Sequence, residues 1–76
     1  MSEKMEKITI KDEFIKLGQA MKLAGFVDSG LDAKICIQGG KVKVNGEVCL
    51  QRGKKLYDKD IFSFESKEAV ISSDNG

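Results

Sequence analysis

The segment 39–46, Gly-Gly-Lys-Val-Lys-Val-Asn-Gly, constrains the fold of this chain more than any other part of its sequence. Its two valines alternate with lysines, which is the two-residue period of a β-strand with one buried face. The closing Asn45-Gly46 suits a type I′ turn, because both central residues of that turn need a positive φ. The opening pair of glycines ends whatever element comes before. The segment therefore predicts a β-hairpin, with residues 47–50 as its second arm.

Two short helices are predicted before this hairpin. Asp12 is a candidate N-cap for the first helix, and Gly25 is a candidate stop, so we expect this helix over residues 13–24. Ser29 followed by Asp32 resembles a capping box and predicts the start of the second helix. The apolar residues of the first helix recur at spacings of three and four, as one buried face requires, and are Phe14, Leu17, Met21 and Ala24.

Short strands are expected on both sides of this helical pair. Residues 7–10 alternate polar and apolar side chains and predict an edge strand. Residues 51–55 predict a polar connection, a turn at 58–60 leads into a strand at 61–64, and 68–71 adds a final strand. The expected class is α+β, a two-helix unit followed by a small antiparallel β-hairpin sheet.

The length of the chain limits how many such units it can contain. A chain of 76 residues has room for one domain, and at this size only about 60% of the unfolded surface becomes buried. We expect a single domain over residues 7–71, with 1–6 and 72–76 frayed because they have little to bury. Functional groups are then expected on the surface rather than in a deep cleft.

The residue types that the chain lacks argue against catalysis. It has no histidine, and therefore no general base of the usual kind at neutral pH. It also has no glycine-rich phosphate motif of the P-loop or dinucleotide-binding type. Cys36 and Cys49 cannot complete a four-ligand zinc site without unusual help, so we expect reduced packing residues. The sequence predicts a protein that is not an enzyme and that binds no metal or cofactor.

The hydropathy of the sequence predicts the subcellular location of the protein. No window approaches 18 consecutive apolar residues, and the charged residues 1–7 lack the apolar run of a signal peptide. Apolar residues make up 41% of the chain and charged residues 33%, which is typical of a soluble domain. We expect a cytoplasmic protein with no membrane partner.

Positive charge is concentrated in the middle of the chain. The net charge is only +1, but residues 34–59 hold seven basic and two acidic side chains. Such a block is what a polyanion-binding face needs, although lysines also populate ordinary solvated surfaces. The basic residues of the block are Lys34, Lys41, Lys43, Arg52, Lys54, Lys55 and Lys59.

The order of a helix pair, a Gly-x-Val-x-Val-Asn-Gly hairpin and a basic loop resembles the S4 domain, the RNA-binding domain named after ribosomal small-subunit protein four. The resemblance covers about residues 10–71 and is most specific over 29–46. Residues 17–19, 22–24, 29–30 and 52–57 look closer still to the small free-standing bacterial members of that family. The residues of 29–46 that fit the family pattern are Ser29, Ala33, Lys34, Ile37, Gly40, Val42, Val44, Asn45 and Gly46.

The resemblance implies RNA binding, through a surface made by the two helices with the adjoining hairpin and loop, the arrangement known as the alpha-L motif. Larger relatives often carry arginine after the serine and again in the second helix, whereas this chain has Gly30 and Ile35. An arginine can bind a phosphate through two hydrogen bonds, while a lysine offers a point charge. With Lys22 of the first helix added, the expected RNA-binding residues are Lys22, Ser29, Lys34, Lys41, Lys43, Arg52, Lys54 and Lys55.

Two functions are consistent with these features. The first is a non-catalytic, monomeric RNA-binding module for structured RNA, ribosomal or otherwise folded, with a place in translation and association with ribosomes. The alternative is an adaptor whose basic surface docks an acidic protein of the translation or replication machinery. The resemblance also suggests a third class, an RNA-modifying enzyme, because similar domains occur as appendages on pseudouridine synthases; we expect no catalytic domain here.

Overall fold

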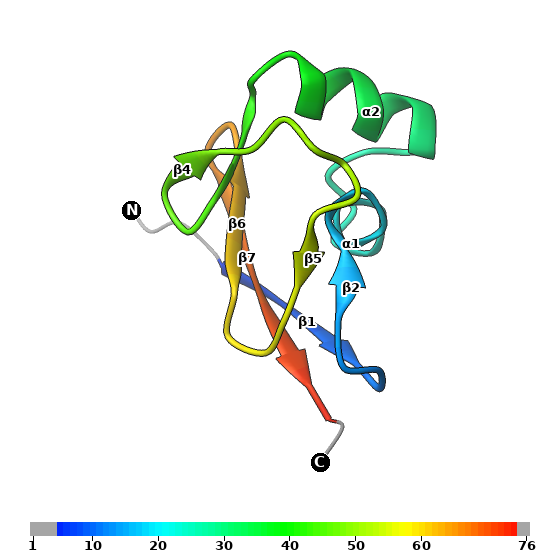
Figure 1. Cartoon of the computed structure of the whole chain (residues 1–76), viewed down its shortest axis with the longest axis vertical. Coiled ribbons are helices and arrows are strands. Elements are labelled where there is room, and N and C mark those ends of the chain that lie inside the picture. Colours follow the sequence, from blue (N-terminus) through cyan, green and yellow to red (C-terminus); the bar gives the residue numbers. More distant parts are fainter. Residues whose placement is uncertain (1–4, 75–76) are drawn as a thin grey trace.

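The computed structural model describes residues 5–74 of the chain (Figure 1). Within these residues the α+β prediction is confirmed, because two helices lie beside a five-stranded mixed sheet and a separate two-stranded pair. The helices are α1 (Leu17–Leu23) and α2 (Gly30–Gln38). The strands are β1 (Met5–Ile10), β2 (Ile15–Lys16), β3 (Val42–Val44), β4 (Glu47–Val48), β5 (Lys55–Leu56), β6 (Ile61–Phe64) and β7 (Lys67–Ser73).

The five-stranded sheet has the order β1-β7-β6-β3-β4. β1 lies at one edge, as predicted, and pairs in parallel with β7, whereas the other neighbours in this sheet are antiparallel. The parallel register places Met5 opposite Glu68 and Ile10 opposite Ser73. The paired strands thus reach beyond 7–71 at both ends, so Met5, Glu6, Ser72 and Ser73 depart from the expectation of frayed termini. Residues 1–4 and 75–76, also expected to fray, lie outside the described residues.

One apolar core joins the long sheet to the helices and the β2–β5 pair. In β3 and β6 alternate side chains are buried, so that Val42 and Phe62 lie in the same buried cluster as Leu17 and Met21 of α1. Lys43, between the two valines of β3, is exposed, because successive side chains of a strand point to opposite faces. The largest fully buried side chains are Phe62, Leu17, Met21, Ile37, Leu56, Ile71 and Val42.

The first helix is shorter than the sequence predicts. It begins at Leu17 rather than residue 13, and its N-cap Lys16 makes no side-chain capping bond, so Asp12 does not cap it. The reason is tertiary: Ile15 and Lys16 form β2, which pairs with Leu56 and Lys55 of β5. Phe14 therefore lies outside the helix and packs on Tyr57.

The polar connection predicted over 51–55 is also shorter, because Lys55 already belongs to β5. The second arm of the hairpin is reduced to β4; residues 49–50 belong to no strand, although the Cys49 N–H still donates to the Val42 carbonyl oxygen at 3.0 Å. The connection ends early because β5 pairs with β2 outside the long sheet.

The end of α1 and the start of α2 follow the sequence closely. Gly25 has a φ of +79° after α1, a left-handed conformation that costs glycine little. The Ser29 hydroxyl accepts a hydrogen bond from the Asp32 backbone N–H at 3.2 Å, which confirms Ser29 as the N-cap of α2. These local capping signals therefore locate α2 to within a residue or two.

Asn45 fixes the hairpin to the neighbouring strand as well as forming its turn. Asn45 and Gly46 have φ values of +52° and +90°, as the type I′ turn requires. The side-chain oxygen of Asn45 accepts from the Ile61 N–H at 3.0 Å, and its amide nitrogen donates to a carboxylate oxygen of Asp60 at 3.2 Å. The side chain thus connects the β3–β4 turn to the start of β6.

We expect Asn45→Ala to lower the free energy of unfolding by about 1–3 kcal/mol, measured by urea denaturation. The change removes two hydrogen bonds, each worth roughly 1 kcal/mol, and places alanine in the left-handed region, which asparagine tolerates better. Asn45→Gly removes the same bonds without that backbone cost, so its loss should be smaller. An alanine variant as stable as the parent protein would show that the side-chain bonds contribute nothing.

The two cysteines are free and half-buried, and both pack against the core. The thiol of Cys49 lies 3.5 Å from the Gln51 carbonyl oxygen. Their expected role as packing residues agrees with this placement. Neither α1 nor α2 is long and apolar enough to cross a membrane.

Candidate nucleic-acid interface

Residues 49–54 connect β4 to β5, and backbone hydrogen bonds fix this connection to the first turn of α1. The Leu17 N–H donates to the Lys54 carbonyl oxygen at 2.9 Å, and the Gly18 N–H donates to the Arg52 carbonyl oxygen at 3.0 Å. Amides in the first turn of a helix have no partner within the helix, so these carbonyls replace the missing side-chain cap. The backbone of the connection is held, while the side chains of Arg52 and Lys54 remain exposed.

Gly18 lies against this connection, with room for a methyl group. A Cβ at that position would lie 3.6 Å from the Arg52 carbonyl oxygen and 3.7 Å from the Arg52 Cβ, which is ordinary van der Waals contact. A side chain longer than a methyl group would meet the connection directly. The position therefore favours a very small residue.

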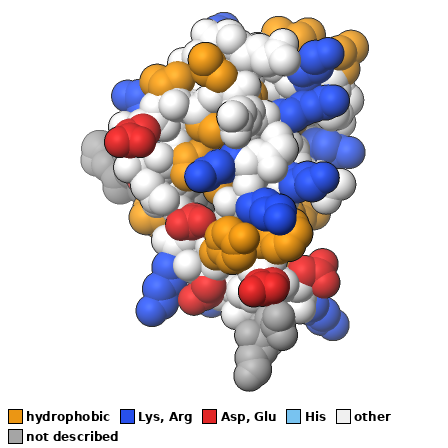
Figure 2. Space-filling model, viewed as in Figure 1, with side chains coloured by type: hydrophobic (Ala, Val, Ile, Leu, Met, Phe, Trp, Pro, Cys, Tyr) orange, Lys and Arg blue, Asp and Glu red, His pale blue; other side chains and the backbone are white. Residues whose placement is uncertain are grey.

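An open groove of about 360 Å³ lies where α1, the start of α2 and this connection meet. Three cationic side chains line it, and none of its lining residues is acidic. Figure 2 shows lysine and arginine side chains gathered over the same side of the molecule. We call this the basic groove; it is lined by Lys16, Gly18, Gln19, Lys22, Gly30, Arg52 and Gly53.

Lys16 is a member of the basic groove that the sequence did not indicate. It lies directly opposite Lys55 in the antiparallel β2–β5 pair, and paired residues of such strands project their side chains to the same face. Two like charges directly opposite are unfavourable there. The repulsion would be relieved by a bound anion. The sequence around Lys16 does not mark it as a binding residue, because the pairing of β2 with the distant β5 determines which side chains lie near it.

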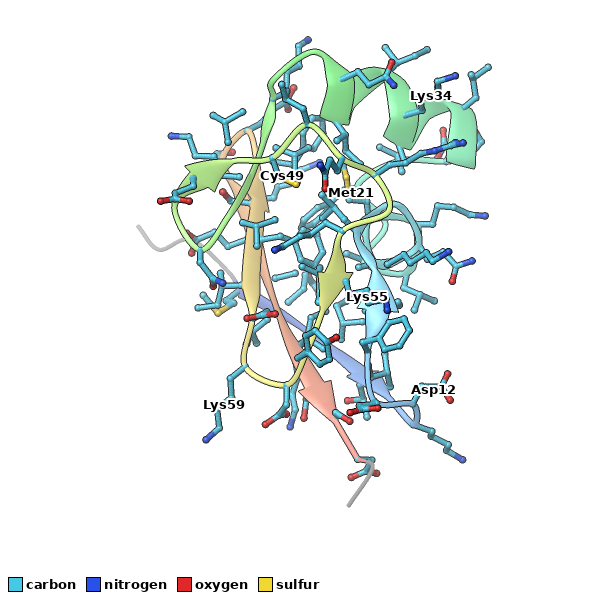
Figure 3. All side chains as sticks on the ribbon, viewed as in Figure 1. Asp12, Met21, Lys34, Cys49, Lys55 and Lys59 are labelled. Carbon is cyan, nitrogen blue, oxygen red and sulfur yellow. The ribbon has the colours of Figure 1, made fainter. Side chains whose placement is uncertain are left out.

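Lys54 and Lys55 line a second, neighbouring groove rather than the basic groove. The Lys55 ammonium lies 4.7 Å from the centroid of the Phe14 ring (Figure 3), within the range of a cation–π contact. Both lysines are exposed. The three basic residues of the connection therefore divide between two adjacent depressions, with Arg52 in one and the two lysines in the other.

The α2 residues that the sequence indicated take two different roles. Ser29 is exposed, and its hydroxyl caps the helix. Lys34 is half-buried on the second turn of α2 (Figure 3). Lys34 does not line the basic groove and adds its positive charge elsewhere on α2.

The two lysines around β3 are separated from the basic groove. Lys41 is exposed between α2 and β3. Lys43 is exposed on the face of the long sheet opposite to the buried Val42 and Val44. The structure therefore brings Lys22 and Arg52 together in one groove and Lys54 with Lys55 in another, but it does not bring Lys43 to either.

No lysine or arginine among residues 5–74 has an ion pair with a carboxylate. On the face that Figure 2 shows, most acidic side chains lie toward the end of the molecule near the C-terminus, although Asp32 lies in the first turn of α2. Clustered charges of one sign raise the local potential above what the net charge suggests. The lining of the basic groove, with Lys16, Lys22 and Arg52 and no carboxylate, is thus positive.

A family model described as the S4 domain matches residues 8–72, which is most of the chain. The chain belongs to the S4 domain family. A curated relative named "Probable ribosome maturation protein RlbA", from Bacillus subtilis strain 168, is 43% identical over 58 residues. The aligned part covers 76% of this chain and 82% of the relative.

The two α2 positions at which the resemblance implies arginine in larger relatives are Gly30 and Ile35 in this chain. A Cβ added at Gly30 would meet nothing within 4 Å, and Ile35 is 60% exposed. A side chain at position 30 would extend from the edge of the basic groove. The glycine leaves the groove open, so its positive charge comes from α1, β2 and the connection.

Proposed function

We propose that this S4 domain is a non-catalytic RNA-binding module of the cytoplasm that recognises structured RNA in ribosome-related processes. Ribosomal RNA is the favoured target, because the name of the Bacillus relative refers to ribosome maturation. The observation that carries the proposal is the basic groove, in which Lys16, Lys22 and Arg52 converge from separate segments without an acidic neighbour in the lining.

The geometry favours recognition of RNA shape over recognition of a base sequence. Lysine and arginine contacts to phosphates fix the position of a protein on a nucleic acid but carry no sequence information directly. The groove is built on α1 and on a connection held by two backbone hydrogen bonds, so the backbone positions of its cationic residues are fixed relative to one another. Fixed positions suit the phosphates of a folded RNA, whose own spacing is fixed.

The test is ultraviolet crosslinking in living cells, followed by identification of what is joined to the protein. We expect crosslinks to RNA, reproducible positions in one or a few folded RNAs, and crosslinked peptides that contain residues 16–22 or 52–55. Binding to the same RNA fragments should then be reproduced with the purified protein.

An adaptor for an acidic protein would give a different result. In that case crosslinks would join the same surface to a protein, and purified protein would bind the RNA fragments no better than an unrelated domain of equal net charge. Either finding would reject the RNA-binding proposal.

A further inference from the structure

A second depression lies beside the basic groove, between the β4–β5 connection and the turn that leads into β6. Its volume is about 720 Å³. We call it the Tyr57 groove; its principal lining residues are Val48, Leu50, Lys54, Lys55, Tyr57 and Asp60. It combines exposed apolar side chains with two cations, whereas the basic groove has cations and small residues.

Tyr57 is held in place from behind and remains accessible in front. Its ring packs on Phe14 with a centroid separation of 5.8 Å and an interplanar angle of 52°. Its backbone N–H donates to a carboxylate oxygen of Asp60 at 2.7 Å. The residue nevertheless stays 44% exposed. An aromatic ring fixed in this way is a ready surface for a flat ligand.

The cations that line the Tyr57 groove favour an anionic ligand there, whereas Glu13 and Asp58 line a separate depression that Tyr57 also borders. Lys54 and Lys55 are both exposed in the lining. The carboxylate of Asp60 is already engaged, because one oxygen accepts from the Tyr57 N–H and the other from the Asn45 side chain. Glu47 is exposed in the lining and is the one acidic group there that makes no such bond.

We propose that the Tyr57 groove binds one unpaired nucleotide of the RNA that occupies the basic groove. The base stacks on the Tyr57 ring beside the exposed side chains of Val48 and Leu50, and the adjoining phosphate lies near Lys54 and Lys55. Unpaired bases are bound in this way by aromatic side chains, with little preference for sequence. The proposal rests on the proposed RNA-binding function.

Continuity between the grooves supports this occupant. Arg52 lines the basic groove and Lys54 lines the Tyr57 groove, and the carbonyls of both residues are bound to α1. One RNA backbone that passes over this connection meets both sets of cations. A folded RNA with a bulged or terminal unpaired nucleotide therefore fits the two grooves together better than a fully paired one.

The test compares two RNA hairpins with the same stem, one fully paired and one with a single bulged nucleotide, by fluorescence anisotropy. We expect Tyr57→Ala to weaken binding of the bulged hairpin at least about fivefold, the loss that removal of one base stack produces. Binding of the fully paired hairpin should change less than about twofold. Tyr57→Phe keeps the ring and should bind both hairpins as the parent protein does.

A second measurement does not depend on affinity. The chain has one tyrosine and no tryptophan, so its intrinsic emission reports Tyr57 alone. After correction for RNA absorbance, saturation with the bulged hairpin should quench this emission more strongly than saturation with the paired hairpin. Thermal denaturation of each variant shows whether the fold is retained.

The outcomes separate the two proposals. If the parent protein binds neither hairpin nor any cellular RNA, the proposed function fails, and the nucleotide site fails with it. If the parent protein binds RNA but Tyr57→Ala weakens both hairpins equally or neither, and quenching is the same for both, only the nucleotide site is overturned.

Discussion

Replacing Lys16, Lys22 and Arg52 together with glutamine is expected to weaken binding to structured RNA on the order of 100-fold at about 0.1 M salt. These three side chains line the basic groove. Each phosphate contact releases a counterion, and at that salt concentration the loss of one contact lowers the binding constant by a factor of about five to eight. The measurement is a titration of fluorescent RNA with the parent protein and the variant.

The matched control replaces Lys7, Lys59 and Lys67 with glutamine. All three are exposed and lie outside both grooves, and the control removes the same net charge. It should weaken binding only severalfold. Glutamine retains much of the apolar stem of each side chain, and exposed substitutions usually change stability by no more than about 0.5 kcal/mol each. Equal losses in the two triple variants would mean that overall charge, not the basic groove, determines affinity.

A change in salt concentration should have the second large effect on RNA affinity. If about four phosphates are neutralised, the slope of log K against log salt is near −3, which corresponds to roughly 60-fold weaker binding at 200 mM than at 50 mM. In the Lys16, Lys22 and Arg52 variant the slope should fall in magnitude by about 2 to 3, because three contacts are gone. The same titrations, repeated at four or five salt concentrations, give both slopes.

A parent protein whose RNA affinity does not change with salt would contradict the phosphate-contact model. So would a variant that loses affinity but keeps the slope of the parent protein, because the loss would then have a cause other than missing phosphate contacts. The control triple should leave the slope nearly unchanged.

The parts of the fold that could be predicted are those set by local chemistry. Ser29 caps α2, Gly25 follows α1 in a left-handed conformation, and Asn45-Gly46 makes the hairpin turn. Each feature depends on backbone preferences that a few neighbouring residues determine. The concentration of charge in residues 34–59 likewise located part of the candidate surface from sequence alone.

The parts that could not be predicted depend on pairing between distant segments. Asp12 and Phe14 fit a helical pattern, but the β2–β5 pair delays the start of α1 until Leu17. The same pairing places Lys16 near Arg52, which no spacing along the chain indicates. Conversely, Lys43 belongs to the basic block by position but projects from the other face of the sheet. Sequence order locates charge along the chain, whereas the sheet decides which face carries it.

The parallel pairing of β1 with β7 has a consequence for the order in which the domain folds. β1 is an edge strand, and β7 is its neighbour in the sheet, although nearly the whole domain separates them along the chain (Figure 1). During synthesis β1 leaves the ribosome first and stays unpaired until β7 has been made. Closing so long a loop is entropically costly and slows folding. The charged side chains of Glu6 and Lys7, exposed on β1, discourage it from pairing with other chains during that delay.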